Sequence, residues 1–139
     1  MTTIKKVAVI GTGVIGAGWI IRCLAHKKIV YAFDKDLKLK KNLIVEIKRT
    51  WPYVKKLFKK KKLNLKNFKY FTSIEIALRD ADFIQECVSE NYALKTKLMS
   101  LIEKYAKPNA IISSSSSGLL PTKIYSKCKN PERTMIGHP

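Results

Sequence analysis

Acidic residues and arginine are both scarce in this sequence. Asp and Glu number 10 in 139 residues, against 28 Lys and Arg, so the formal net charge is +18. Such an excess favours an anionic partner, which includes nucleic acids, anionic membranes and phosphorylated ligands. Only four of the 28 are arginine, the residue most used to read bases and to grip phosphates. The abundance of Ile, Asn, Tyr and Lys indicates codon bias in an AT-rich genome as another source of the charge.

Cysteine is rare as well, and its placement suits neither a disulfide framework nor a metal. Cys23, Cys87 and Cys128 are widely spaced and form no Cys-x-x-Cys pair. This pattern predicts free thiols in a reducing cytoplasm. His26, which lies beside two lysines, is interpreted as a surface residue, and Cys87 as packing at a strand end. No metal site is predicted.

Long hydrophobic runs are missing too. The nearest candidate is the stretch 7–21, which follows Lys5 and Lys6 as the apolar part of a signal peptide would. Four glycines interrupt this stretch, no Ala-x-Ala cleavage site follows it, and Arg22 before Cys23 argues against a lipoprotein signal. It is also too short to span a bilayer. We therefore expect a cytoplasmic protein without a membrane segment.

The length and the 46% hydrophobic content suit one domain, 1–139, with its own core. The expected strands are 6–10, 29–33, 68–71, 83–88, 110–112 and 134–137. The expected helices are 14–25, a helical region 36–62 in which Pro52 starts a second helix, a short helix capped by Ser73, 93–105, and a short helix after Pro121. This alternation predicts the α/β class, as a Rossmann doubly wound parallel sheet of about six strands with a helical excursion between strands 2 and 3.

The segment after the first expected strand carries a dinucleotide-binding pattern. Gly11, Gly13 and Gly16 form Gly-x-Gly-x-x-Gly between a strand and a helix. The first glycine permits the tight turn, the second lets the backbone approach a pyrophosphate, and the third lets the helix pack closely on the strand. Asp34 ends the next strand, 18 residues after Gly16, which is the context that the pattern requires.

The start of the following helix completes this prediction. Its free backbone N–H groups, at Val14 and Ile15, are expected to hold the phosphates at the positive end of the helix dipole. The Asp34 carboxylate would accept hydrogen bonds from ribose hydroxyls and repel a 2′-phosphate, so NAD is favoured over NADP. The alternative, a glycine-rich turn that binds nothing, is disfavoured by the matched context.

Five serines run from Ser113 to Ser117. Such runs are typical of flexible linkers. This one, however, directly follows an apolar strand, at the strand end where open α/β sheets bind ligands. His138 also ends an expected strand, so we expect it to meet the serines at one crevice. A histidine in this position alone is more often a solvated bystander.

Together these segments resemble the NAD-binding domain of the 3-hydroxyacyl-CoA dehydrogenase superfamily over essentially the whole chain. The resemblance rests on residues 7–16, Glu90-Asn91, Ser-Ser-Ser-Ser-Gly-Leu-Leu-Pro-Thr at 114–122 and Pro-Glu-Arg-Thr-Met-Ile-Gly-His-Pro at 131–139. Ser-Gly-Leu-Leu-Pro, Gly-His-Pro and the strand 84–88 are most similar to the branch of L-carnitine dehydrogenase and lambda-crystallin (L-gulonate dehydrogenase).

The resemblance implies an NAD-dependent oxidoreductase that oxidises the 3-hydroxyl of L-carnitine or a similar 3-hydroxy acid to the 3-oxo product. It assigns the substrate-binding serine to Ser117 and the catalytic histidine to His138. Glu90 and Lys95 match positions that line the nicotinamide-ribose side of the cofactor site. An imidazole suits the transfer of the hydroxyl proton in both directions, and a serine hydroxyl can hold the substrate oxygen.

The sequence departs from the family pattern in several places. In fatty-acyl enzymes of the superfamily, Asn occupies the position of Ser115, and the first of two Phe residues after the histidine occupies the position of Pro139. The family usually has Pro at the position of Ser89, directly before Glu90. The chain also stops inside the His-x-x-Asn-Pro signature, before the glutamate that orients the histidine, a later active-site Asn and the helical domain that forms the family's dimer interface. We therefore expect an N-terminal fragment or a truncated reading frame, homodimeric only at full length, that binds NAD(H) with little or no turnover.

The positive charge is concentrated in residues 35–69, where 14 basic and two acidic residues give a net +12. In acyl-CoA enzymes of the superfamily this excursion contacts the CoA nucleotide, and Lys55, Lys56 and Lys59–Lys62 are candidates for its phosphates. A 3-hydroxyacyl-CoA dehydrogenase is therefore an alternative function. A solvated, lysine-rich helix face is the simpler interpretation of the charge. The alternative from another class is an inactive nucleotide- or nucleic-acid-binding fragment, with nucleic acid the disfavoured partner.

Overall fold

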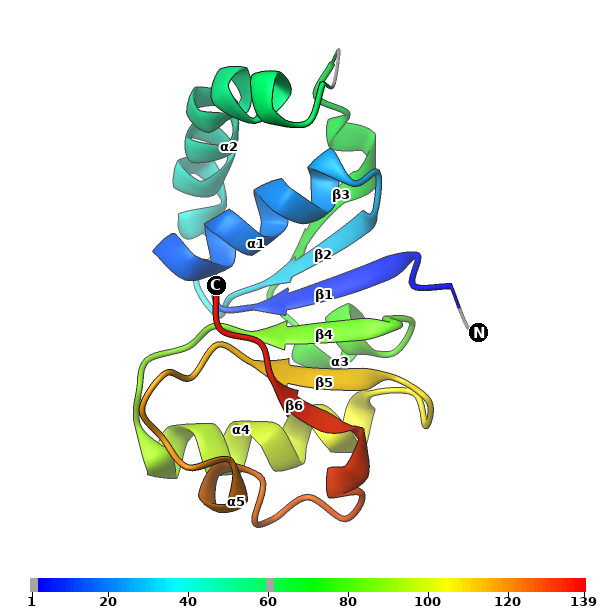
Figure 1. Cartoon of the computed structure of the whole chain (residues 1–139), viewed down its shortest axis with the longest axis vertical. Coiled ribbons are helices and arrows are strands. Elements are labelled where there is room, and N and C mark those ends of the chain that lie inside the picture. Colours follow the sequence, from blue (N-terminus) through cyan, green and yellow to red (C-terminus); the bar gives the residue numbers. More distant parts are fainter. Residues whose placement is uncertain (1–2, 60–61) are drawn as a thin grey trace.

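The computed structural model describes residues 3–59 and 62–139. Within them the chain forms a six-stranded parallel sheet in the order β3-β2-β1-β4-β5-β6 (Figure 1). The strands are β1 (Lys6–Ile10), β2 (Ile29–Phe33), β3 (Phe68–Phe71), β4 (Phe83–Glu86), β5 (Ile111–Ser114) and β6 (Thr134–Ile136). The strand order reverses between β1 and β4, and ligands of open α/β sheets bind at the carboxyl ends of the strands near such a point.

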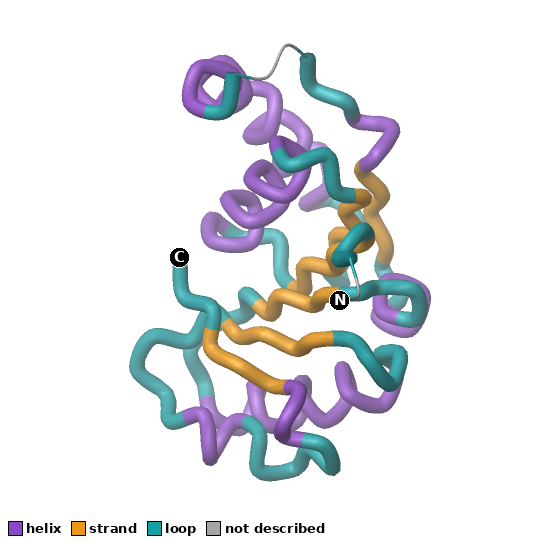
Figure 2. The backbone as a smooth tube through the Cα atoms, turned by 45° about the vertical axis from the view of Figure 1, so that its right-hand side comes forward, coloured by secondary structure: helices purple, strands orange, loops and turns teal. Residues whose placement is uncertain are grey.

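Helices cover both faces of the sheet. One face carries α1 (Val14–Ala25) and α2 (Leu39–Leu57), and the other carries α3 (Ile74–Leu78), α4 (Tyr92–Tyr105) and α5 (Pro121–Ile124). Figure 2 shows the strands between these two groups of helices. Short 3-10 turns at Leu65–Asn67 and Pro131–Arg133 precede β3 and β6. The doubly wound Rossmann sheet predicted from the alternating pattern is confirmed.

The central strand shows why the sequence is apolar without interruption there. In β1, Val7 and Val9 face the core under α1 and α2, whereas Ala8 and Ile10 face the core formed with α3, α4 and α5. All four side chains are buried. Because both faces of a parallel strand are covered, no polar residue alternates with them.

The region 36–62 differs from the expectation. The prediction that Pro52 starts a new helix is wrong, because α2 is continuous from Leu39 to Leu57. Proline removes one backbone donor and crowds the preceding turn, which bends a helix without ending it when both flanks are packed. Trp51 and Val54 are buried on either side of it, and the ribbon changes direction in the later part of α2 (Figure 1). Residues 60 and 61, also assigned to the helical region, lie outside the described residues.

The three thiols are free and have unreactive surroundings. No disulfide joins Cys23, Cys87 and Cys128 in the part of the chain that the structure describes. Burial raises the pKa of Cys23 and of Cys128 to about 11, and that of Cys87 to about 12. The thiols are therefore protonated at neutral pH and serve as packing.

None of the described helices has both the length and the apolar character needed to cross a membrane.

Asp82 ties the N-terminal end of β1 to the start of β4. Its Oδ2 accepts the backbone N–H groups of Lys5 and Lys6, both at 2.8 Å, and its Oδ1 pairs with the Lys107 ammonium. Partial burial opposes ionisation of this carboxyl, but these donors outweigh it and lower its pKa to about 2.

We expect Asp82→Asn to lower the free energy of unfolding by about 2 kcal/mol at pH 7. The folded-state pKa lies below the ordinary value of 3.8, so this stabilisation is fully present above about pH 4 and is lost as the pH falls through about 2. Urea unfolding at several pH values should show that the free energies of unfolding of Asp82→Asn and of the unmodified chain become equal in acid. Asp80→Asn, at a carboxylate with a 55% exposed side chain, is the control and should change stability by less than about 0.5 kcal/mol. If the difference in free energy of unfolding stayed constant down to pH 2, the ionised Asp82 carboxylate would not be the source of the stabilisation.

Candidate active site

The loop between β1 and α1 depends on glycine at two positions. Gly11 has φ +94°, and a Cβ there would lie 2.9 Å from the carbonyl oxygen of Cys87. A Cβ on Gly16 would lie 1.9 Å from the carbonyl oxygen of Gly11, which no side chain can accept. These two glycines therefore let the loop turn between β1 and β4 and let α1 approach it closely.

The N-terminus of α1 is open to an anion. Gly13 is the N-cap residue, and apart from its chain neighbours no described residue comes within 4 Å of the place where its Cβ would be. The first N–H groups of a helix have no partner inside the helix and carry its positive dipole end. Val14, which follows, is 89% exposed, and Ile15 is 43% exposed. The cradle fits the pyrophosphate of a dinucleotide.

Asp34 lies at the carboxyl end of β2 and faces this loop. Its Oδ2 accepts the backbone N–H of Thr12 at 3.1 Å and the Thr12 hydroxyl at 3.0 Å. The same carboxylate and Gly11 border a hollow of about 410 Å³. The rest of its wall is mostly apolar and comes from Ile10, Phe33, Ile74, Val88, Leu94, Leu98 and Leu101, together with Lys35 and Lys97. An apolar slot beside a carboxylate fits a nucleoside, whose base is flat and whose ribose offers hydroxyl donors.

A second hollow, of about 340 Å³, brings together most of the residues singled out from the sequence. It lies where the β1–α1 loop, the β4–α4 connection, the serine loop and the segment after β6 converge. The predicted site residues on its wall are Gly13, Val14, Ile15, Glu90, Lys95, Ser117 and His138. Gly11 and Asp34 border the other hollow, and Gly16 packs beneath the loop.

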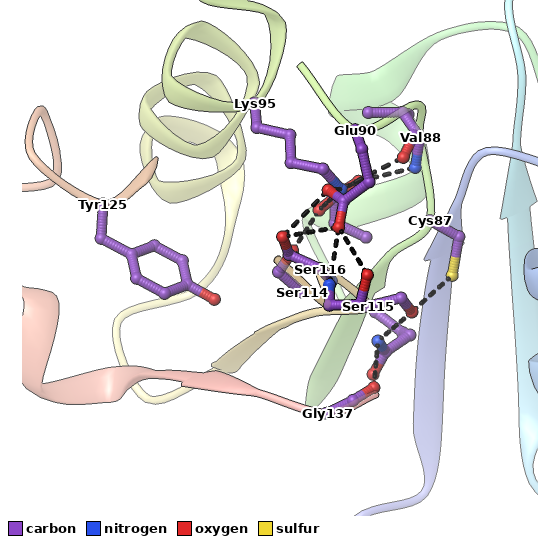
Figure 3. Close-up of polar contacts among 12 residues, drawn as sticks. Cys87, Val88, Glu90, Lys95, Ser114, Ser115, Ser116, Tyr125 and Gly137 are labelled. Carbon is purple, nitrogen blue, oxygen red and sulfur yellow. Dashed lines mark hydrogen bonds and ion pairs between the residues drawn. The ribbon is translucent and has the colours of Figure 1, made fainter. Parts of the chain in front are cut away.

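The serine run is an ordered part of this site (Figure 3). Ser114 ends β5 and donates its hydroxyl to Glu86, and Ser115 accepts a hydrogen bond from Gln85 at 2.7 Å. Ser116 donates to Glu90 at 2.9 Å. A flexible linker would make no such set of specific contacts, so the linker interpretation of these serines is wrong.

Glu90 holds the far end of the serine loop. Its Oε1 accepts the backbone N–H of Ser117 at 2.6 Å and lies 3.3 Å from the Ser117 hydroxyl. Burial opposes ionisation of Glu90, but the Ser117 N–H, the Ser116 hydroxyl and the Lys95 ammonium outweigh it, so its pKa lies below the ordinary value. Glu90 is therefore a carboxylate at neutral pH and fixes the position of Ser117.

Lys95 lies at the edge of the hollow that it lines, with only 1% of its side chain exposed. Its ammonium donates to both carboxylate oxygens of Glu86, at 2.8 and 2.9 Å, and to the carbonyl oxygen of Val88 at 3.1 Å. Glu90 lies 3.5 Å away on the other side. Lys95 thus links a buried carboxylate on β4 to the carboxylate that holds the serine loop.

His138 follows β6 after one residue, Gly137, and is exposed on the wall of the second hollow. The hollow also contains Ser117, which comes from the loop after the neighbouring strand. An imidazole and a hydroxyl thus share one opening with the N-terminus of α1. No group of three or more His, Cys, Asp or Glu side chains among the described residues could hold a metal ion.

With this geometry in place, comparison with known proteins decides the family. Residues 6–139 match the model of the 3-hydroxyacyl-CoA dehydrogenase, NAD binding domain. The chain belongs to the 3-hydroxyacyl-CoA dehydrogenase family. The family predicted from the sequence motifs is confirmed, and NAD is the cofactor of this kind of domain.

Individual members of the 3-hydroxyacyl-CoA dehydrogenase family show how much of a relative the chain represents. It is 42% identical over 139 residues to an L-carnitine dehydrogenase of Pseudomonas sp, and 39% identical over 134 residues to that of Staphylococcus epidermidis. These alignments cover 100% and 96% of this chain but 43% and 42% of the relatives. The 3-hydroxybutyryl-CoA dehydrogenase of Escherichia coli K12 superposes with a TM-score of 0.89 and 27% identity, over 99% of this chain and 30% of that one. The chain therefore spans less than half of the relatives it matches.

Two buried polar residues of this dehydrogenase-family site were not identified from the sequence. Gln85 and Glu86 are fully buried on β4, where they contact the serine loop. The available signal was the presence of two polar residues in an otherwise apolar strand, because such residues are buried only with partners.

The described part of the lysine-rich segment forms α2 and residues that lead to β3. Its apolar residues Leu43 and Ile47 pack in the core with α1, while its described lysines are exposed. Of the lysines considered for CoA phosphates, those described and exposed are Lys55, Lys56, Lys59 and Lys62. Lys60 and Lys61 lie outside the described residues.

Proposed function

We propose that this chain is the cofactor-binding part of an NAD-dependent dehydrogenase that oxidises the 3-hydroxyl of L-carnitine, or of a similar 3-hydroxy acid, to the 3-oxo product. The observation that carries the proposal is the second hollow, in which Ser117 and His138 share one opening with the N-terminus of α1. Relatives about 40% identical over the whole chain are L-carnitine dehydrogenases, which supports this substrate class.

The chain's own residues provide the cofactor site. The first turn of α1 binds the pyrophosphate, and Asp34 accepts the adenosine ribose hydroxyls in the first hollow. When bound, NAD supplies a hydride acceptor at its nicotinamide ring. Glu90 and Lys95 line the second hollow, where the nicotinamide ribose is proposed to lie.

The proton chemistry belongs to His138. Its imidazole takes the hydroxyl proton as the substrate is oxidised and returns it in the reverse direction. Ser117 donates a hydrogen bond to the substrate oxygen and stabilises the charge that develops there. Glu90 keeps Ser117 in place, because it accepts the backbone N–H of that residue at 2.6 Å.

Asp34→Ala is expected to weaken NADH binding by roughly 10- to 100-fold, because hydrogen bonds to a charged acceptor contribute about 1.5–3 kcal/mol. It should also narrow the preference for NADH over NADPH, since the charge that repels a 2′-phosphate is gone. Asp36→Ala removes an equal charge two residues away and is the matched control. Fluorescence titration of the purified chain measures both affinities. Equal NADH affinity in Asp34→Ala and the unmodified chain would refute the cofactor site.

The substrate is tested separately, by following NADH formation with the natural protein that contains this chain. L-Carnitine should be oxidised, and His138→Gln should lower kcat about 100-fold or more with little change in NADH affinity. Turnover of 3-hydroxybutyryl-CoA in place of L-carnitine would support the acyl-CoA alternative. Binding of NADH without oxidation of either compound would refute the proposed reaction and leave the cofactor site standing.

A further inference from the structure

Gln85 is a buried polar residue on β4 that the proposed reaction does not use. Its side chain is completely buried. Its Nε2 donates to the hydroxyl of Ser115 at 2.7 Å and to the carbonyl oxygen of Gly137 at 3.1 Å. The second acceptor lies 52 residues away in the sequence, directly before His138. Figure 3 shows Ser115 and Gly137 as the two ends of this connection.

The backbone at Gly137 is held from two sides. Its N–H donates to the carbonyl oxygen of Ser114 at 2.9 Å, which is the last backbone bond between β5 and the end of β6. Its carbonyl oxygen accepts the Gln85 bond. A Cβ at Gly137 would lie 2.4 Å from the Ser113 hydroxyl and 3.3 Å from Oε1 of Gln85, so the backbone passes directly against these side chains. The peptide between Gly137 and His138 therefore owes its orientation to Gln85.

The two ends of the Gln85 carboxamide differ in their hydrogen bonding. Among the described atoms, Oε1 of Gln85 and the hydroxyl of Ser113 are buried without a hydrogen-bond partner. An unpaired buried oxygen opposes folding, whereas the two hydrogen bonds of Nε2 favour it. The paired end of the carboxamide is the one that joins the serine loop to the residue before His138.

We propose that Gln85 is a positioning residue for His138, and that it fixes the backbone carrying His138 against the serine loop by bonding both segments with one carboxamide. A neutral amide suits this task because its two N–H groups serve two acceptors, whereas a carboxylate offers no donor. The inference rests on the proposed function only in giving His138 a catalytic task. The hydrogen bond from Gln85 to the carbonyl oxygen of Gly137, called the clamp below, is independent of that function, because it rests on geometry alone.

Gln85→Met tests the clamp, since methionine keeps the length of the side chain and removes both donors. We expect the chain to fold, with a thermal midpoint within about 5 °C of the unmodified chain. The ¹⁵N order parameter of the His138 amide should fall from about 0.85 to below about 0.6, with NADH affinity changed less than about twofold. Ser113→Ala, which touches Gly137 without bonding it, is the control and should leave His138 ordered. An ordered His138 in Gln85→Met would overturn the proposal.

Two further measurements keep the clamp and the proposed function apart. If Gln85→Met fails to fold, Gln85→Leu replaces it and is judged by the same order parameter. In the natural protein, loss of the clamp should lower kcat about 10-fold or more and leave the KM for NAD unchanged. If the KM for NAD rose by the same factor as kcat fell, the positioning role would be overturned. Failure of the unmodified chain to bind NADH would refute the proposed function. The order parameter of the His138 amide would still show whether Gln85 holds the backbone at Gly137.

Discussion

Gly16→Ala is expected to weaken NADH binding by at least about 100-fold, which corresponds to about 2.7 kcal/mol. The added Cβ would lie 1.9 Å from the carbonyl oxygen of Gly11, so either α1 or the loop must move. That oxygen belongs to backbone with φ +94°, packed against Cys87, and it has little room to yield. The N-terminus of α1 then shifts from the position in which its N–H groups can hold a pyrophosphate.

Gly18→Ala is the matched control, two residues further along the same helix. Outside the adjacent backbone of α1, no described atom lies within 4 Å of its Cβ position, so the methyl group fits. Alanine should stabilise α1 by up to about 1 kcal/mol and leave NADH affinity unchanged. Thermal unfolding and fluorescence titration of both variants distinguish a local clash from a general effect of alanine. Tight NADH binding by Gly16→Ala would show that the close helix–loop contact is not needed.

The architecture could be predicted because each strand has a local signal. Continuous apolar runs such as 7–10 and 29–33 are required where both faces of a strand are covered, and the structure has strands at those residues. The glycine pattern was equally informative, because the clashes at Gly11 and Gly16 are consequences of local backbone geometry. Here local chemistry and the tertiary fold agree.

The errors arose where tertiary contacts outweigh local preference. The sequence pattern ended the fifth strand at Ile112, whereas β5 continues through Ser113 and Ser114. Serine has a weak strand preference, but the hydroxyl of Ser114 is satisfied by Glu86 on the neighbouring strand. Likewise, Pro52 ends a helix by its local rule, yet the buried residues around it keep α2 continuous.

The candidate site could be predicted only in its outline. The positions of Asp34, Ser117 and His138 follow from strand ends, since the carboxyl ends of parallel strands meet at one edge. The partners of Gln85 and Lys95 depend on which strands become neighbours and how their registers align. No local pattern contains that information, so the buried network beneath the hollow emerged only from the structure.

That network leads to the largest stability effect we expect. Lys95→Met should lower the free energy of unfolding by about 3–5 kcal/mol, because it leaves the Glu86 carboxylate buried without its cation. Glu86 has no exposed surface and would keep only the N–H of Val88, at 2.6 Å, and the hydroxyl of Ser114. Urea unfolding at pH 7 measures the loss. Lys97→Met, on the exposed face of the same helix, is the control and should change stability by less than about 0.5 kcal/mol.

The double variant separates the cost of an unpaired charge from the contribution of the pair. Glu86→Gln alone should also be strongly destabilising, because it leaves the Lys95 ammonium buried at 1% exposure without its main partner. Combining it with Lys95→Met removes both charges, and the stability should return to within about 2 kcal/mol of the unmodified chain. Such non-additivity would identify Glu86 and Lys95 as one coupled unit beneath the hollow. Additive losses would instead show that each side chain is stabilised by its other contacts, Lys95 by Glu90 and the Val88 carbonyl, and Glu86 by the Ser114 hydroxyl.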